Sequence, residues 1–307
     1  MPKHAARWIR TASARTSVML SRPMRKWGGA WGSTLKVSDF RSILGVTFFK
    51  RRQQEDSAMK TTTKAALGAL LMTSAGAANA VVPLVDVDVT AGYWNADPSG
   101  TIQSGGDPID VENDLGYDSE GHNNFAIRFA HPIPVIPNLR LRYNDIEHKG
   151  TGTVVLKEFE GKTYAGDVSS RTDLTHYDYT AFYTAPIPVV TLDLGLNVKH
   201  FDGEVSVREQ SSGGNSETVE VDEFLPMGHV RADVDLPLTG LGAGAELNYI
   251  SYDGDSATDV EGYISFNADP VYIQGGYRQF DVDVDASGDL NVDTELSGPF
   301  VRLGVGF

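Results

Sequence analysis

Charged side chains recur at every second position within segments that are otherwise apolar. Arg140, for example, lies between Leu139 and Leu141. In a β-strand, this period of two places the charges on one face and the apolar side chains on the other. Opposite charges gathered in an interior either pair with one another or line a hydrophilic passage. The candidate residues for such an interior network are Arg128, Arg140, Arg142, Asp178, Asp193, Arg231, Asp233, Asp235, Glu246, Glu261, Arg278 and Arg302.

A second candidate for chemistry is an acidic segment close to the C-terminal end. From Asp283 to Asp293, it places Asp, Ser or Asn at alternate positions around Gly288, as calcium-binding loops do. The final ligand position holds Thr294, where such loops need a bidentate glutamate. We therefore predict no defined metal site and no cofactor, although clustered carboxylates in acidic loops can hold calcium or magnesium diffusely.

The composition narrows the possible chemistry. The 307-residue chain has no cysteine, which excludes disulfides, thiolate metal sites and cysteine nucleophiles. The first 80 residues hold 14 basic and 3 acidic residues, whereas residues 81–307 hold 12 basic and 38 acidic residues. An acidic body of this size repels phosphate, so no nucleic acid is expected as a partner. The abrupt change of charge indicates that two unrelated kinds of sequence meet near residue 80.

The segment 59–80 has the three parts of a secretory signal peptide, in order. Its start is basic, its middle is apolar but shorter than the ~20 residues of a membrane helix, and small residues at Ala78 and Ala80 mark a cleavage site. Because a signal peptide belongs at an N terminus, Met59 is the predicted initiator. Residues 1–58 are then a non-native or disordered basic leader, the alternative being a functional presequence. Residues 81–307 form the predicted mature domain.

Alternation with a period of two appears ten times after residue 80. The ten predicted strands are 85–93, 125–130, 139–144, 176–183, 190–199, 230–235, 243–249, 260–266, 271–278 and 301–307. Short turns are expected at 131–137, 185–188, 236–240 and 268–270, and long polar loops at 95–121, 147–171, 201–219, 252–259 and 281–296. Short and long connections alternate along the chain. All long loops should therefore lie at one end of the sheet, and all short turns and both termini at the other.

Such a sheet can form a soluble sandwich, with its apolar face inside, or a transmembrane barrel, with that face toward lipid. Unpaired charges in mid-strand would be unfavourable in a sandwich core, and short turns opposite long loops are typical of outer-membrane barrels. Aromatic residues near strand ends suit the interface girdles of such barrels: Tyr93, Trp94, Tyr143, Tyr183, Tyr249, Tyr252, Phe266 and Tyr272. The sequence therefore predicts an all-β fold, a ten-stranded antiparallel up-and-down transmembrane β-barrel with short periplasmic turns and longer extracellular loops.

The chain ends in Phe-Val-Arg-Leu-Gly-Val-Gly-Phe at 300–307, which resembles the β-signal of bacterial outer-membrane proteins. With its Pro-Ile-Pro turns and the Ala-Gly-Tyr-Trp of its first strand, the mature chain is similar to a group of uncharacterised outer-membrane β-barrel proteins of Gammaproteobacteria. The resemblance implies export to the outer membrane, with lipid and lipopolysaccharide around the barrel. It also implies that the barrel-assembly machinery recognises the last strand through Phe300, Leu303, Val305 and Phe307. The resemblance implies no reaction.

Strand number bears on function, because about eight strands are just filled by side chains and wide aqueous pores need roughly sixteen. We therefore predict a structural or surface-interacting protein with a narrow, salt-bridged interior, and not an enzyme. One alternative is a narrow channel for ions or small solutes. Another is an enzyme at the rim, such as an omptin-like protease or a lipid A-modifying enzyme. It would need a histidine within ~3 Å of a carboxylate or hydroxyl in an open cleft. The histidines near long-loop ends are His122, His148, His176 and His200.

Overall fold

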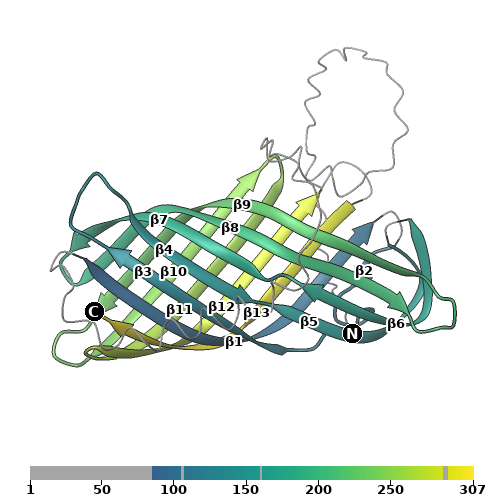
Figure 1. Ribbon diagram of the computed structural model, residues 1–307, viewed down its shortest axis with the longest axis horizontal. Coiled ribbons are helices and arrows are strands. Elements are labelled where there is room, and N and C mark those ends of the chain that lie inside the picture. The colour runs from purple at the N-terminus through teal and green to yellow at the C-terminus, as the bar shows by residue number, and fades with distance from the viewer. Residues whose placement is uncertain (1–84, 105–106, 160, 286–289) are drawn as a thin grey trace, which may run out of the picture. The chain divides into compact units, whose positions relative to one another are not determined.

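Ten strands form a closed antiparallel barrel in the computed structural model, which describes residues 85–104, 107–159, 161–285 and 290–307 (Figure 1). The barrel strands are β1 (Asp86–Ser104), β3 (Glu120–Ala130), β4 (Asn138–Asp145), β7 (His176–Ile187), β8 (Val190–Glu209), β9 (Ser216–Asp235), β10 (Leu241–Tyr252), β11 (Asp255–Ala268), β12 (Val271–Asp285) and β13 (Leu290–Gly306). Neighbours along the barrel pair in sequence order, and β1 closes the ring against β13. The predicted ten-stranded up-and-down barrel is confirmed.

The predicted leader, the signal peptide and its cleavage residues Ala78 and Ala80 lie outside the described residues, so these remain predictions. The described part of the chain contains no helix long and apolar enough to cross a membrane.

The outer face of the barrel carries a continuous apolar belt. Along β10, for example, Leu241, Leu247 and Tyr249 are exposed on this face, while Glu246 and Asn248 are buried on the other. Nine residues per strand, at about 3.3 Å each and tilted by about 40°, give the belt a height of about 23 Å. The exposed members of the belt are Tyr93, Phe125, Phe129, Leu139, Leu141, Tyr179, Tyr183, Leu194, Leu196, Phe224, Val230, Val234, Leu241, Leu247, Tyr249, Val260, Ile264, Phe266, Val271, Ile273, Tyr277, Val301, Leu303 and Phe307.

Two residues of the predicted aromatic girdle do not belong to the outer face. Trp94 is only 1% exposed, and its indole N–H donates a hydrogen bond to the carbonyl of Gly298 at 3.1 Å inside the barrel. Tyr272 donates its hydroxyl proton to the carboxylate of Asp88 at 2.8 Å. Each follows an outward residue directly, and neighbouring side chains of a strand point to opposite faces. The girdle prediction is therefore wrong for these two residues.

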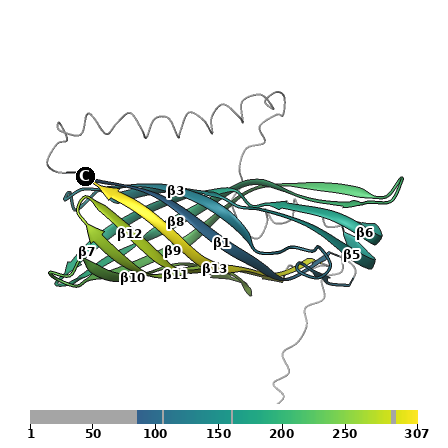
Figure 2. The ribbon, with the colours of Figure 1, turned by 90° about the horizontal axis from the view of Figure 1, so that it is seen from below.

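The predicted long loops are mostly strand. β8 and β9 continue far past the belt and are joined by only 210–215, and β10 and β11 are joined by 253–254. Two strands that were not predicted, β5 (Glu147–Phe159) and β6 (Lys162–Asp173), form a hairpin where a loop was expected. Together β5, β6, β8 and β9 make a four-stranded sheet, here called the extension, at the barrel end opposite the C terminus (Figure 2).

The extension was not predicted because its apolar side chains face inward, whereas those of the belt face outward. Within the belt, apolar side chains of β8 such as Leu196 point outward. Beyond the belt, Val205 and Val207 pack inward, and the polar Ser206 and Arg208 line an outer groove. The hydrophobic alternation therefore changes phase beyond the belt, and a pattern that follows the belt strands does not continue into the extension.

A connecting segment, residues 107–119, packs against the inner face of the extension. It contains β2 (Ile109–Asp110), which pairs with β1. Its apolar residues share a core with the inner residues of β5, β6 and β8, and Ser170 donates its hydroxyl proton to the carbonyl of Leu115 at 2.8 Å. The members of this core are Ile109, Val111, Leu115, Tyr117, Val154, Phe159, Tyr164, Val168 and Val207.

The close approach of this segment depends on glycine, so Gly152→Ala should displace it. A Cβ atom at Gly152 would lie 2.0 Å from the carbonyl oxygen of Asp114. Overpacking of this kind costs about 1–3 kcal/mol, so we expect amide exchange in 109–117 to rise by about tenfold to a hundredfold. Gly262→Ala is the matched control, because nothing lies within 4 Å of its added Cβ. Equal exchange in both variants would refute the role assigned to Gly152.

Candidate functional site: the charged barrel interior

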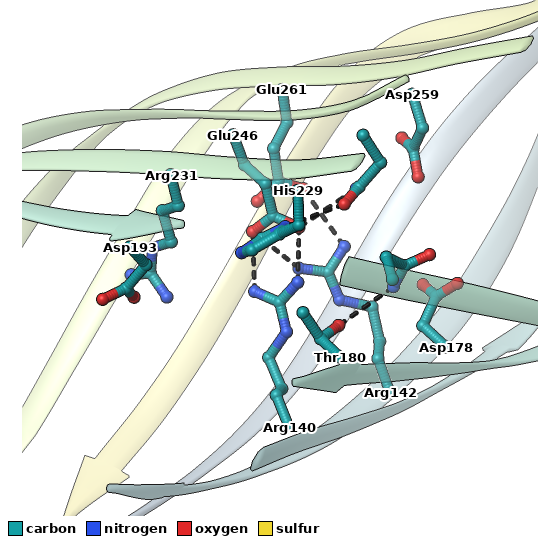
Figure 3. A network of polar contacts seen from close by, with 12 residues as sticks. Arg140, Arg142, Asp178, Thr180, Asp193, His229, Arg231, Glu246, Asp259 and Glu261 are labelled. Carbon is teal, nitrogen blue, oxygen red and sulfur yellow. Dashed lines mark hydrogen bonds and ion pairs between the residues drawn. The ribbon is translucent and has the colours of Figure 1, made fainter. Parts of the chain in front are cut away.

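The middle of the barrel interior is filled by arginine–glutamate pairs (Figure 3). Arg140 of β4 donates two hydrogen bonds to the two carboxylate oxygens of Glu246 on β10, at 2.6 and 2.5 Å. Arg302 of β13 binds both oxygens of Glu261 on β11, at 3.1 and 3.0 Å. Arg142 lies between the two pairs and reaches both glutamates at 3.5 Å. These five side chains, here called the central network, are all buried.

A second buried network lies nearer the extension. The ammonium group of Lys199 donates hydrogen bonds to Asp178 at 2.9 Å and to Asp259 at 2.6 Å. Arg278 binds both oxygens of Asp259 at 2.9 Å. Asn144 connects the two carboxylates, because its amide donates to Asp178 at 3.1 Å and its carbonyl accepts from Arg278 at 3.0 Å. Lys199 is 0% exposed, which makes it the most completely enclosed charge of the network.

Aromatic rings cover this second network. The guanidinium group of Arg278 lies 4.7 Å from the ring centre of Trp94, and the ammonium group of Lys199 lies 5.5 Å from that of Phe280. Both rings belong to a buried apolar cluster that also contains Phe201. The ion pairs are therefore separated from water on this side, where their attraction is strongest.

Further ion pairs lie toward the short turns. Arg128 contacts Asp193 at 3.3 Å, and Arg231 contacts Asp233 at 2.8 Å. Asp235 does not join them. It is exposed at the end of β9, where it accepts a hydrogen bond from Asn267 at 3.3 Å. The structure thus places eleven of the twelve candidate interior residues in ion pairs and leaves Asp235 at the rim.

Sequence reasoning missed two central members of the interior, Lys199 and Asp259. Lys199 ends the predicted strand 190–199 on its polar face but is absent from the candidate residues, and Asp259 lies one position before the predicted strand 260–266. Following the polar face of the first strand to its last residue, and extending the second strand by one residue before Val260, places both on the charged face.

Three of the four candidate histidines are buried. Nε2 of His122 lies 3.3 Å from Nε2 of His148, just beyond the belt. Burial lowers the pKa of His148, which lies on β5 in the extension. His176 lies 3.8 Å from the carboxylate of Asp178, inside the second network.

The fourth histidine, His200, lies on the outer face. Its Nε2 is 3.1 Å from the carboxylate of Asp222, and its ring stacks on Phe224 at 4.0 Å. Neither of the two hollows described below is lined by any of these four histidines.

Two hollows among the described residues bear on function. One, of about 20 Å³, lies inside the barrel on the short-turn side of the central network, and is here called the vestibule. The other is a groove of about 400 Å³ on the outer face of the extension. The groove is lined by Lys149, Ser169, Ser170, Arg171, Glu204, Ser206, Arg208, Ser216 and Thr218.

The last strand presents the predicted assembly residues on two faces. Leu303 and Phe307 are exposed on the belt, and Val305 lies on the same face between them. Phe300 is buried inside the barrel, where the guanidinium group of Arg302 lies 4.8 Å from its ring centre.

The predicted acidic loop falls partly outside the described residues, because 286–289 are not among them. Its described parts belong to β12 and β13, in which Asp283 pairs with Asp293. Within the described ranges, no group of three or more His, Cys, Asp or Glu side chains is placed to hold a metal ion.

The pairing and burial define the class of this fold as a closed ten-stranded antiparallel β-barrel with an apolar outer belt and an ion-paired interior. No protein-family model matches the sequence, and no curated protein is significantly similar to it.

The chain is distantly similar to several solved barrels. Ail, the attachment invasion locus protein of Yersinia pestis, is 11% identical, with 73% of this chain and 99% of that chain covered and a TM-score of 0.34. An outer-membrane channel of Pseudomonas putida F1 is 8% identical, with 74% and 97% covered and a TM-score of 0.35. The toluene transporter TodX of P. putida is 8% identical, with 74% and 91% covered and a TM-score of 0.29. At these values the similarity carries no argument about the function of this chain.

Proposed function

We propose that this chain is an integral outer-membrane barrel with a closed interior and a structural or surface-interacting role. The observation that carries the proposal is the combination of an apolar belt outside with buried ion pairs across the inside. Soluble proteins rarely expose a contiguous apolar patch larger than a few hundred Å². A belt that surrounds the whole barrel needs lipid as its solvent, and a closed barrel leaves no unpaired strand edge in that lipid.

The short turns extend the apolar surface at one end. Val135, Val189 and Leu238 are exposed at the tips of three turns, and Val189 and Leu238 have φ angles of 62° and 68°. Residues other than glycine and asparagine are strained in this left-handed region, so these aliphatic side chains are held outward at some energetic cost. Contact with the headgroup region of the periplasmic leaflet offsets that cost.

Closure of the interior favours a non-conducting barrel over the channel alternative. Arginines and carboxylates from facing walls meet in the central network, where both partners are buried. Ions can pass only if several of these pairs separate, and separating a buried pair costs about 3–5 kcal/mol. A narrow channel is the second candidate, because the charged lining runs along the interior from Asp193 to Asp178.

Planar-bilayer recording of the refolded protein tests this proposal. We expect conductance at the level of the leak for the wild type. Replacing Arg142, Glu246 and Glu261 together by alanine widens the bore at its middle and should produce steady conductance. Migration as a compact, heat-modifiable band shows that each preparation holds a folded barrel. Steady conductance of the wild type would establish the channel instead.

The outer groove of the extension is the surface that suits an interacting role. Its hydroxyl groups and the guanidinium group of Arg208 match the sugars and phosphates of lipopolysaccharide, whereas Lys149 and Arg171 pair with Glu147. The extension lies beyond the belt, at the level where such headgroups surround an outer-membrane barrel.

If the last strand is an assembly signal, Phe307→Ala should lower the outer-membrane level of the protein in cells but leave refolding in detergent intact. The backbone of Phe307 exchanges hydrogen bonds with Val87 at 3.1 and 2.8 Å, and these remain in the variant. The lost lipid contact costs about 1.5–3 kcal/mol, so the barrel should still refold in detergent. In cells, we expect a several-fold lower outer-membrane level, measured by immunoblot of membrane fractions.

Phe266→Ala is the matched control for this experiment, because Phe266 is an equally exposed belt aromatic near the same rim. Its loss should reduce stability by a similar amount but leave the outer-membrane level nearly unchanged. Equal levels of the two variants in cells would remove the special role of the last residue.

A further inference from the structure

The vestibule has an unusual lining. Five arginines border its volume of about 20 Å³, and one carboxylate, that of Asp88, faces them. The carboxylates that pair with these arginines, including Glu246 and Glu261, do not line the hollow. The vestibule is therefore bordered by the cationic side of the interior network. The five arginines are Arg128, Arg140, Arg142, Arg231 and Arg302.

Two of these guanidinium groups carry buried donors that the described residues leave unpaired. Both terminal nitrogens of Arg140 bind Glu246, and its Nε has no hydrogen-bond partner. Arg140 is only 7% exposed, so bulk water does not supply the missing acceptor. Arg128 binds Asp193 through one terminal nitrogen, and its buried Nε likewise lacks a partner. A buried donor left unpaired costs about 1–3 kcal/mol, and more when it is charged.

Few acceptors line the vestibule. Asp88 accepts a hydrogen bond from Tyr272 at 2.8 Å, and Gln274 accepts one from Arg302 at 3.1 Å. Guanidinium groups only donate, and each carries five N–H groups. The vestibule therefore has an excess of donors over acceptors. A water molecule would add two more donors, whereas an anion adds none.

We propose that the vestibule binds one small monovalent anion of about the size of chloride. A hollow of about 20 Å³ suits a single small ion better than phosphate, sulfate or an organic carboxylate. The anion accepts hydrogen bonds from the guanidinium groups of Arg128 and Arg140 and lies among the five arginines. It lies at the short-turn end of the central network and supplies the acceptor that Nε of Arg140 lacks.

Bromide serves as the probe, because it replaces chloride and scatters X-rays anomalously. We expect crystals of the refolded protein grown in bromide to show an anomalous peak in the vestibule, within hydrogen-bond reach of Arg128 and Arg140. In detergent, bromide and chloride should raise the Tm saturably, in excess of fluoride or sulfate at equal ionic strength.

Two variants and one control complete the test. Ala126→Leu fills the vestibule without changing any charge, and Arg128→Gln removes one donor; both should abolish the halide-specific rise in Tm. Arg171→Gln, on the extension, should retain it. A Tm that follows ionic strength alone, or bromide peaks that avoid the vestibule, would overturn the proposal. The diffraction experiment uses the wild type, so it tests halide binding in the vestibule even where a variant does not fold.

Discussion

Replacing Lys199 with methionine should lower the free energy of unfolding of the barrel by about 3–5 kcal/mol. Methionine conserves the volume of the side chain but removes the cation that binds Asp178 at 2.9 Å and Asp259 at 2.6 Å. Asp259 keeps Arg278 as a partner, whereas Asp178 loses its closest cation. A buried carboxylate without a cation is far less stable than in water. Denaturant titration of the refolded protein, followed by fluorescence, measures the change.

Lys149→Met is the control for this experiment, because the side chain of Lys149 is 64% exposed and pairs with Glu147 at 2.6 Å. Exposed pairs contribute about 0–1 kcal/mol, so little change is expected. Adding Asp178→Asn to the Lys199 variant removes the unpaired charge and should restore much of the lost stability. A Lys199 variant no less stable than the Lys149 variant would show that the buried cation is not needed.

Replacing Leu196 with arginine should destabilise the barrel in phospholipid vesicles by about 2–4 kcal/mol. Leu196 is 65% exposed near the middle of the belt, and in a soluble protein a charge at so exposed a position would be tolerated. In the proposed orientation, the guanidinium group would instead lie in hydrocarbon. Reversible guanidinium unfolding of the vesicle-inserted protein gives the free energy.

Val155→Arg provides the comparison, since Val155 is 75% exposed but lies on β5, in the extension. A charge there meets water or headgroups, so a change within about 0.5 kcal/mol is expected. Equal effects of the two arginines would contradict the assignment of the belt to lipid.

The barrel could be predicted from sequence because one rule governs every strand inside the belt. Leu139 and Leu141 must face outward and Arg140 inward, and each residue follows from its neighbour. The rule fails for β5 and β6, where water lies outside and the connecting segment packs inside. At Gly150 and Gly152, what matters is the close approach of another backbone, which no pattern within β5 records.

The sequence pattern also does not predict which charged side chains pair with one another. That charges face inward follows from alternation, but Arg142 meets Glu246 and Glu261 only because the closed ring brings β4 opposite β10 and β11. Register across the interior depends on strand tilt and stagger, which are properties of the whole sheet. The vestibule has the same origin, because its arginines come from β3, β4, β9 and β13.

The position of Arg142 and Glu261 has a mechanical consequence. β4 and β11 are separated by four strands in either direction around the ring, so this contact spans a diameter of the barrel. A hollow tube under sideways load flattens into an ellipse, and its wall resists only by bending. Here, side chains act as cross-struts within the bore, and flattening along that diameter compresses them. When the bilayer thickens, curves or is stretched by turgor, the barrel should keep a round cross-section at its middle, and deformation should concentrate in the extension.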